Sequence, residues 1–483
     1  MVLRVLHQSP RHLAMLLAAL VFALAFWHGP VSGPLVDSGH FAGIAKTLAE
    51  TGQYAVNGVP SGFYPVYPTF LAAAMVLVGP LWQNMAVALA SVLLFVSAWL
   101  FFAKALDEKK AVLAAVVLAV TPLFVNAGLQ LLTDGLFLAF AMLSGWAYLW
   151  ALEKPDWRQT GILAVFLSLC VLTRISGLLL IGIFVAHMAW RAWAGKTHIH
   201  WKPIALVLVF AAVVFGAWAL RNQAAGIGDA TGGYADTLSS PIAAFVTLDS
   251  TGGRTTASFE EFRTVNGVRE DLNGALVMAV PFNLGLDASW QWPLAFNYMA
   301  RTAAFLVLLA GIVMVAVSLG GAAKWLAAKN AQSRFKRMDA GAALLVLWFL
   351  GFAAFHILSP AALPSRYLLP LVVPLAAGFA VFVSDVGRKK AVALLLGHLL
   401  VCGAVLAWDS GNRWQSDADA AAVFSQAGQW IDAHAPTDAM VRVSGVPPDT
   451  AYFYSGRMAR EDAGSVFMAS NYGQETPPQG LSA

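Results

Sequence analysis

Long apolar runs separated by short polar stretches dominate the pattern of this sequence. Eleven runs contain no Asp, Glu, Lys or Arg. A helix needs ~20 mostly apolar residues to cross a bilayer. Lipid offers no hydrogen bonds to the backbone, and a helix makes all of its backbone hydrogen bonds internally. The pattern therefore predicts an all-α polytopic membrane protein with about eleven transmembrane helices. The predicted spans cover residues 13–34, 82–103, 111–133, 135–152, 159–173, 175–190, 203–220, 302–323, 341–358, 367–384 and 391–408.

A twelfth apolar run, residues 67–80, decides the side of everything that follows it. Its fourteen residues are typical of a re-entrant or interfacial segment. If this run stays on the outer face, the basic clusters around Lys109, Arg191, Lys336 and Lys389 all fall in cytoplasmic loops, as the positive-inside rule requires. We therefore expect a juxtamembrane helix here, a cytoplasmic N-terminus and a periplasmic or extracellular C-terminus.

This topology places three polar pieces on the outer side. They are a first outer loop at 35–81, a long outer loop at 222–300 and a C-terminal segment at 409–483. Residues 1–408 form the predicted transmembrane domain, and the C-terminal segment is too small to promise a core of its own. Outer loops carry polar chemistry that the spans lack, so functional residues are expected there.

Composition excludes several classes of protein. The chain of 483 residues is 59% hydrophobic and 12% charged, and its net charge of +4 comes from basic residues in short clusters between apolar runs. A basic stripe along one polar face is missing, so no nucleic-acid partner is expected. Cys170 and Cys402 each lie inside an apolar run and are interpreted as packed thiols.

Five ionisable residues at the ends of predicted spans all fall on the outer side. Ionisable groups near hydrocarbon are costly and are usually paired or functional. Three arginines suit a phosphate, which a guanidinium binds with two hydrogen bonds, and two carboxylates suit a general base or a metal. The five residues are Asp37, Asp134, Arg174, Arg221 and Arg366.

Each of these residues also has a purely structural interpretation. Asp37 fits a solvated turn, and Asp134 fits a helix N-cap. Any one arginine fits an anchor that extends to the membrane surface. Tyr367 fits the aromatic belt of a membrane interface. It is their coincidence on one face that favours a functional site.

Short motifs in this order resemble the GT-C glycosyltransferases, and the resemblance covers nearly the whole chain. Protein O-mannosyltransferases and lipid A aminoarabinose transferases, which are members of the type of glycosyltransferase family 39, share this order of motifs. Asp37 follows the first span, and a Tyr-Pro-Val-Tyr-Pro motif at 64–68 contributes Tyr64 and Tyr67. The remaining matches are Thr133-Asp134, Leu172-Thr-Arg174, Arg221-Asn222 and Ser365-Arg-Tyr367.

One position departs from the family pattern. Several members carry a second acidic residue directly after the catalytic aspartate, whereas this chain has Ser38. His40 is a candidate polar contact in its place, although a surface histidine is the commoner explanation. Asp37 and Asp134 are a weak pair of candidate ligands for a divalent ion. The sequence therefore implies no required cofactor, and use of a divalent metal stays open without support.

The resemblance implies inverting transfer of a sugar from a polyprenyl-phosphate-sugar donor to an acceptor hydroxyl. It implies Asp37 as the general base and Arg174, Arg221 and Arg366 as ligands of the lipid phosphate. The acceptor would be a glycan, a lipid or a protein, and the site would face the periplasm at a bacterial inner membrane. Two alternatives stay open: a transporter or flippase of lipid-linked saccharides, and an envelope polymerase or ligase.

Overall fold

The structure is a computed structural model that describes residues 10–31, 33–34, 37–153, 156–195, 201–227, 339–358, 368–411, 413–436, 440–443, 448–457 and 459–461. Helices account for most of these residues. The helices of the membrane domain are α2 (Pro10–His28), α5 (Trp82–Ala105), α6 (Glu108–Ala119), α7 (Pro122–Leu129), α8 (Thr133–Glu153), α9 (Trp157–Val171), α10 (Leu178–Trp193), α11 (Trp201–Ala224), α17 (Ala340–Leu358), α18 (Leu369–Asp385) and α19 (Arg388–Gly411), with the 3-10 turn η2 (Ile175–Gly177) before α10.

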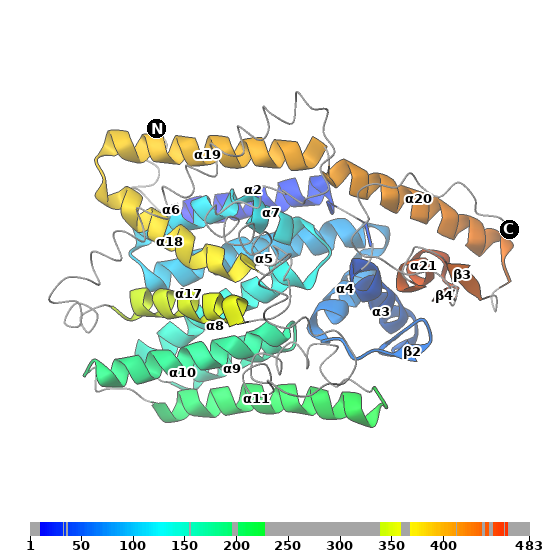
Figure 1. The fold of residues 1–483 in the computed structure, drawn as a ribbon, viewed down its shortest axis with the longest axis horizontal. Coiled ribbons are helices and arrows are strands. Elements are labelled where there is room, and N and C mark those ends of the chain that lie inside the picture. The colour runs from blue at the N-terminus through cyan, green and yellow to red at the C-terminus, as the bar shows by residue number, and fades with distance from the viewer. Residues whose placement is uncertain are drawn as a thin grey trace, which may run out of the picture.

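The remaining elements gather at one end of this bundle (Figure 1). They are α3 (Asp37–Thr51), β1 (Ala55–Val56), β2 (Val59–Pro60), α4 (Val66–Val78), the 3-10 turn η1 (Gly79–Leu81), α20 (Arg413–His434), β3 (Val441–Val443), α21 (Pro448–Ser455) and β4 (Ala459–Glu461). In Figure 1, α20 continues from the end of α19 beyond the bundle, and α21 lies next to α3. The predicted first outer loop and C-terminal segment therefore meet at one end of the molecule.

The helical prediction is confirmed for the described residues. Helical stretches at Val66–Ala105, Thr133–Glu153, Ile175–Trp193 and Ile204–Ala224 are long and apolar enough to cross a membrane, and shorter apolar helices accompany them. The predicted span at 302–323 lies outside the described residues, as does most of the long outer loop. The number of crossings and the sides of the termini remain predictions.

The predicted span at 111–133 is not one straight helix. It consists of α6 and α7, which are bent by 70° relative to each other. Pro122 starts α7, and Thr121 before it has an extended conformation with φ −69° and ψ 124°. A proline lacks the backbone N–H and disfavours a helical conformation in the preceding residue, so the helix has to break at this point.

The run at 67–80 forms a separate short helix, α4. Although the apolar stretch continues through η1 into α5, Gly79 at the junction has φ +59° and ψ −129°, which lies outside the α-helical conformation, so α4 ends there. The 13 residues of α4 extend only about 20 Å, less than the ~30 Å of hydrocarbon that a span must cross. α4 packs on α3 instead, through a buried cluster that includes Phe41, Tyr67 and Leu71.

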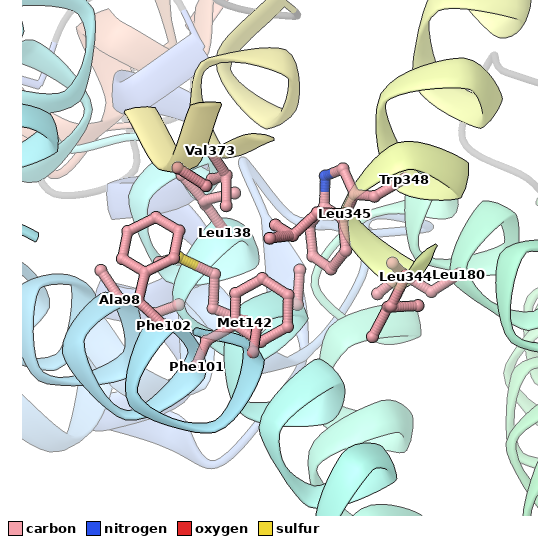
Figure 2. Close-up of a cluster of buried hydrophobic side chains, with 14 of the residues drawn as sticks. Ala98, Phe101, Phe102, Leu138, Met142, Leu180, Leu344, Leu345, Trp348 and Val373 are labelled. Carbon is pink, nitrogen blue, oxygen red and sulfur yellow. The ribbon is translucent and has the colours of Figure 1, made fainter. Parts of the chain in front are cut away.

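The membrane domain has a continuous apolar core. Phe101 and Phe102 of α5 pack with Met142 of α8 and with Trp348 of α17 (Figure 2). The indole N–H of Trp348 donates to the carbonyl of Pro370 at 2.9 Å. Pro374, four residues further along α18, cannot donate to that carbonyl, so the tryptophan satisfies a group that the helix itself leaves open.

Two small sheets belong to the end of the bundle where α3 and α21 lie. β1 and β2 form an antiparallel hairpin whose two-residue turn, Asn57-Gly58, has positive φ at both positions. An Asn-Gly pair favours this turn because both residues tolerate the left-handed conformation. β3 and β4 pair in parallel within the C-terminal segment.

Candidate active site

Asp37 is the first residue of α3, and its side chain is exposed. A carboxylate in the first turn interacts favourably with the positive end of the helix dipole. The opposite face of α3 is buried against α4, which holds the helix in place. His40 lies one turn after Asp37, and its ring centroid is 4.2 Å from that of Phe63. The helix start is thereby connected to the loop that precedes α4.

This loop, residues 61–65, is the centre of the site because α3 and α11 both contact it. Tyr54 donates its phenolic hydrogen to the carbonyls of Phe63 and Tyr64, at 3.0 and 3.1 Å. Burial raises the pKa of the Tyr54 phenol above its usual value, and the nearby Arg221 opposes this only in part, so the donor stays protonated. At the end of the loop, Val66 N–H donates to the carbonyl of Leu172, at 3.3 Å, beside Arg174.

Asp134 and Arg174 form an ion pair that is almost completely buried. The Asp134 Oδ1 atom accepts a hydrogen bond from Arg174 Nη1, and the two residues are 4% and 8% exposed. Asp134 also lies close enough to the Tyr67 phenol to interact with it electrostatically. Two buried charges are tolerated in a low dielectric when they neutralise each other, so much of the Arg174 charge is already compensated.

Close backbone packing positions both members of this pair. A Cβ atom at Gly135, next to Asp134, would lie 2.3 Å from the carbonyl oxygen of Ala127 in α7. A Cβ atom at Gly177, in the turn after Arg174, would lie 2.8 Å from the Cα of Val171. Any larger side chain at either glycine would push the elements apart, so the pair depends on these contacts.

Arg221 has a different environment at the end of α11. Its guanidinium lies over two aromatic rings that themselves meet edge to face, 5.5 Å from the centroid of Tyr54 and 4.8 Å from that of Trp218. Nη1 donates to the carbonyl of Ser61 at 2.7 Å and to Oδ1 of Asn222 at 2.9 Å. Within the described part of the chain, Nε and Nη2 have no hydrogen-bond partner and no carboxylate pairs with the cation.

Asn222 ties this arrangement to the loop. Its Nδ2 donates to the carbonyl of Gly62 at 2.8 Å, and its side chain is buried. The ring of Tyr64 stacks with that of Phe215, also from α11, with centroids 6.1 Å apart. The result is a rigid cation whose remaining donors form one edge, which is the geometry that binds a phosphate with two hydrogen bonds.

The structure brings most of the predicted site residues to the 61–65 loop. His40, Arg221 and Asn222 contact this loop, and Tyr64 belongs to it. Tyr67 follows it in α4 and lies near Asp134, the partner of Arg174, and Asp37 is one turn from His40. Arg366 and Tyr367 lie outside the described residues. Sequence reasoning missed Trp218 and Ser61 as site residues. The spacing of Trp218 and Arg221 by three on one helix was a usable signal, whereas the carbonyl of Ser61 had none.

The described residues contain no group of three or more His, Cys, Asp and Glu side chains that could hold a metal ion. Asp134, one of the two weak candidate ligands, already accepts from a guanidinium. A cation would have to compete with this arginine, so this carboxylate is a poor metal ligand as it stands.

The comparisons with known proteins agree with this architecture. Residues 64–218 match the model of the dolichyl-phosphate-mannose-protein mannosyltransferase family. No curated protein sequence matches the chain. The matched part runs from Tyr64 of the 61–65 loop to Trp218, whose ring contacts Arg221, so it contains the ion pair of Asp134 and Arg174.

Solved structures extend the likeness to nearly the whole chain. ArnT from Cupriavidus metallidurans, bound to undecaprenyl phosphate, matches with a TM-score of 0.58 and 14% identity over 93% of this chain and 85% of that protein. The archaeal oligosaccharyltransferase AglB from Archaeoglobus fulgidus, in complex with an inhibitory peptide and a dolichol-phosphate, matches with a TM-score of 0.54 and 14% identity, over 94% of this chain and 64% of that one. Together with the family model, these matches confirm the resemblance to GT-C glycosyltransferases and show the same polytopic membrane fold.

Proposed function

We propose that this protein transfers a sugar from a polyprenyl-phosphate-sugar donor to an acceptor hydroxyl at the outer face of the membrane. The observation that carries the proposal is Arg221, at the end of the bundle that also bears Asp37. Its guanidinium is held against two rings, and one of its edges meets no hydrogen-bond partner among the described residues. The solved structures of similar fold contain undecaprenyl phosphate or dolichol-phosphate, which supports a lipid phosphate as the group that binds here.

In the proposed reaction, Asp37 accepts the proton of the acceptor hydroxyl. The acceptor oxygen then attacks the anomeric carbon of the donor sugar from the side opposite the phosphate. The bond between that carbon and the phosphate oxygen breaks, and polyprenyl phosphate leaves with the electron pair. A single displacement of this kind inverts the anomeric configuration.

The arginines act on the leaving group in this proposal. Fixed positive donors are most effective where charge develops in the transition state, which here is the bridging oxygen of the phosphate. Arg221 offers its open edge for this purpose, and we propose Arg366 as a second ligand. Arg174 would contribute less, because Asp134 offsets its charge.

The experiment that tests this function compares two carboxylates on the same helix. Purified protein is incubated with a panel of polyprenyl-phosphate sugars and acceptors, and the release of polyprenyl phosphate is measured. Because general base catalysis is worth roughly 10² to 10⁴-fold, Asp37→Asn should reduce kcat by about that factor. Glu50→Gln is the matched control, since Glu50 is exposed near the other end of α3. Near-normal transfer by Asp37→Asn would exclude Asp37 as the base.

A further inference from the structure

The C-terminal segment is fastened to the helix that carries Asp37. The α21 helix lies beside α3 in Figure 1, at the end of the bundle where the site is. The hydroxyls of Thr47 and Tyr452 form a hydrogen bond of 2.9 Å, and Lys46 Nζ donates to the carbonyl of Phe453 at 3.2 Å. These bonds join residues about 400 positions apart in the sequence.

A second attachment lies at the β1 and β2 hairpin. The backbone N–H of Ala459 donates to Asn57 Oδ1 at 2.7 Å, and Asn57 Nδ2 donates back to the carbonyl of Ala459. Hydrogen bonds and an ion pair also join parts of the C-terminal segment to one another. Buried Arg457 donates to the carbonyls of Asp432 and Pro436 near the end of α20, and it pairs with the Asp432 carboxylate at 2.9 Å. The segment therefore meets the first outer loop as one unit.

The two pieces also pack closely at Gly39, two residues after Asp37. A Cβ atom at Gly39 would lie 2.4 Å from Oγ1 and 3.1 Å from Cα of Thr450, and 3.2 Å from the carbonyl oxygen of Pro34. Thr450 is only 1% exposed. The first turn of α3 is thus pressed directly against α21, and the absence of a side chain at position 39 makes this possible.

From this contact we propose that Thr450 is a positioning residue, which through Gly39 holds the first turn of α3 where Asp37 can reach the acceptor hydroxyl. The proposal rests on the proposed role of Asp37 as the base. The remaining contacts, around Thr47 and Asn57, fix the later part of α3 and the hairpin, so they keep the segment in register on the helix. Catalytic groups have to be held closely, because a misplacement of about 1 Å can cost ~10²-fold in rate.

The test adds a methyl group at position 39 and then removes the Thr450 hydroxyl with which it would clash. Gly39→Ala should lower kcat about 10- to 100-fold, leave the KM for the donor within about twofold, and move the acidic limb of the pH profile of kcat. Alanine is a better helix former than glycine, so a loss of helix propensity cannot explain the defect. The double variant Gly39→Ala with Thr450→Ala removes the 2.4 Å clash and should recover at least part of kcat and return the pH profile toward that of the wild type.

Gly161→Ala is the matched control, because a methyl group at that helical position meets no atom within 4 Å. If Gly39→Ala unfolds the protein, Tyr452→Phe provides the second test, since it removes the bond to Thr47 without adding an atom. It should lower kcat by a few fold with the donor KM unchanged.

Two results would overturn the proposal. One is a Gly39→Ala protein with kcat within twofold of the wild type. The other is a folded Gly39→Ala protein whose kcat defect is not relieved at all by Thr450→Ala. Either result, obtained while Asp37→Asn is inactive, would remove only the positioning role. An active Asp37→Asn protein would instead remove the proposed function itself, so the two failures are distinguishable.

Discussion

Arg174 and Arg221 are two arginines at the same end of the bundle with opposite surroundings. Arg174 is buried and paired with Asp134, whereas Arg221 is half-buried, lies over the rings of Tyr54 and Trp218 and is held by backbone and amide oxygens. A carboxylate neutralises a cation, but a carbonyl only orients it. From this comparison we expect a mainly structural role for Arg174, and we propose that Arg221 is the arginine that binds an anion.

The largest expected effect concerns the buried pair. Asp134→Ala leaves the Arg174 charge without its carboxylate in a buried site, which should destabilise the protein by about 3–5 kcal/mol. Thermal unfolding in detergent measures this. Glu153→Ala is the control, because it breaks the exposed ion pair with Lys104 and should cost ~1 kcal/mol or less.

The double replacement Asp134→Leu with Arg174→Met sharpens the same comparison. Replacing a buried pair by apolar residues of similar volume is often neutral or stabilising, so most of the stability lost in Asp134→Ala should return. If Arg174 is mainly structural, the double variant should retain donor binding. A fully stable double variant that no longer binds the donor would show that Arg174 itself contacts the phosphate.

An intermediate effect is expected for Arg221→Ala. Hydrogen bonds to charged groups are worth ~1.5–3 kcal/mol, so the KM for the donor should rise about 10- to 100-fold while the protein stays folded. Binding of polyprenyl phosphate to the purified protein gives an independent measurement. Arg158→Ala is the matched control, since Arg158 also lies near a tryptophan ring, that of Trp157, in another part of the chain. Unchanged donor binding in Arg221→Ala would contradict the assignment.

The smallest effect is expected for Trp218→Ala. The ring orients the guanidinium, and a cation–π contact at a partly exposed site contributes ~0.5–1 kcal/mol, which corresponds to about a two- to fivefold rise in the donor KM. Trp218→Phe keeps an aromatic ring and loses only a long hydrogen bond to the carbonyl of Gly62, 3.4 Å, so it should resemble the wild type. A larger effect of the phenylalanine variant would mean that the indole N–H contacts the donor.

The candidate site was predictable in part. Asp37, Asp134, Arg174 and Arg221 stand out because ionisable residues at the ends of apolar runs are unusual, and the basic loops predict that all four lie on one side. Their partners were not predictable. Nothing local distinguishes Arg174, which meets a carboxylate 40 positions away, from Arg221, which meets the carbonyl of a residue 160 positions away.

The break between α6 and α7 is a feature of the fold that was likewise predictable only in part. The apolar run at 111–133 predicts a span, and Pro122 in it is a visible signal for a kink. The carbonyl of Val117, next to that break, accepts from the hydroxyl of Thr121, which is local, and from His398 of α19, which is not. Packing in the folded protein therefore decides which helix supplies the second donor to this carbonyl.

The sequence by itself determined the membrane class, the helical runs and the order of polar residues along the chain, because hydrophobic length and backbone hydrogen bonding are local properties. Only the tertiary structure decided which arginine pairs with a carboxylate, which one is held by carbonyl and amide oxygens, and that α21 packs on the first turn of α3. These contacts join segments from 40 to about 400 positions apart. Helix packing selects such neighbours by shape and volume, and no local pattern of residue types encodes that choice.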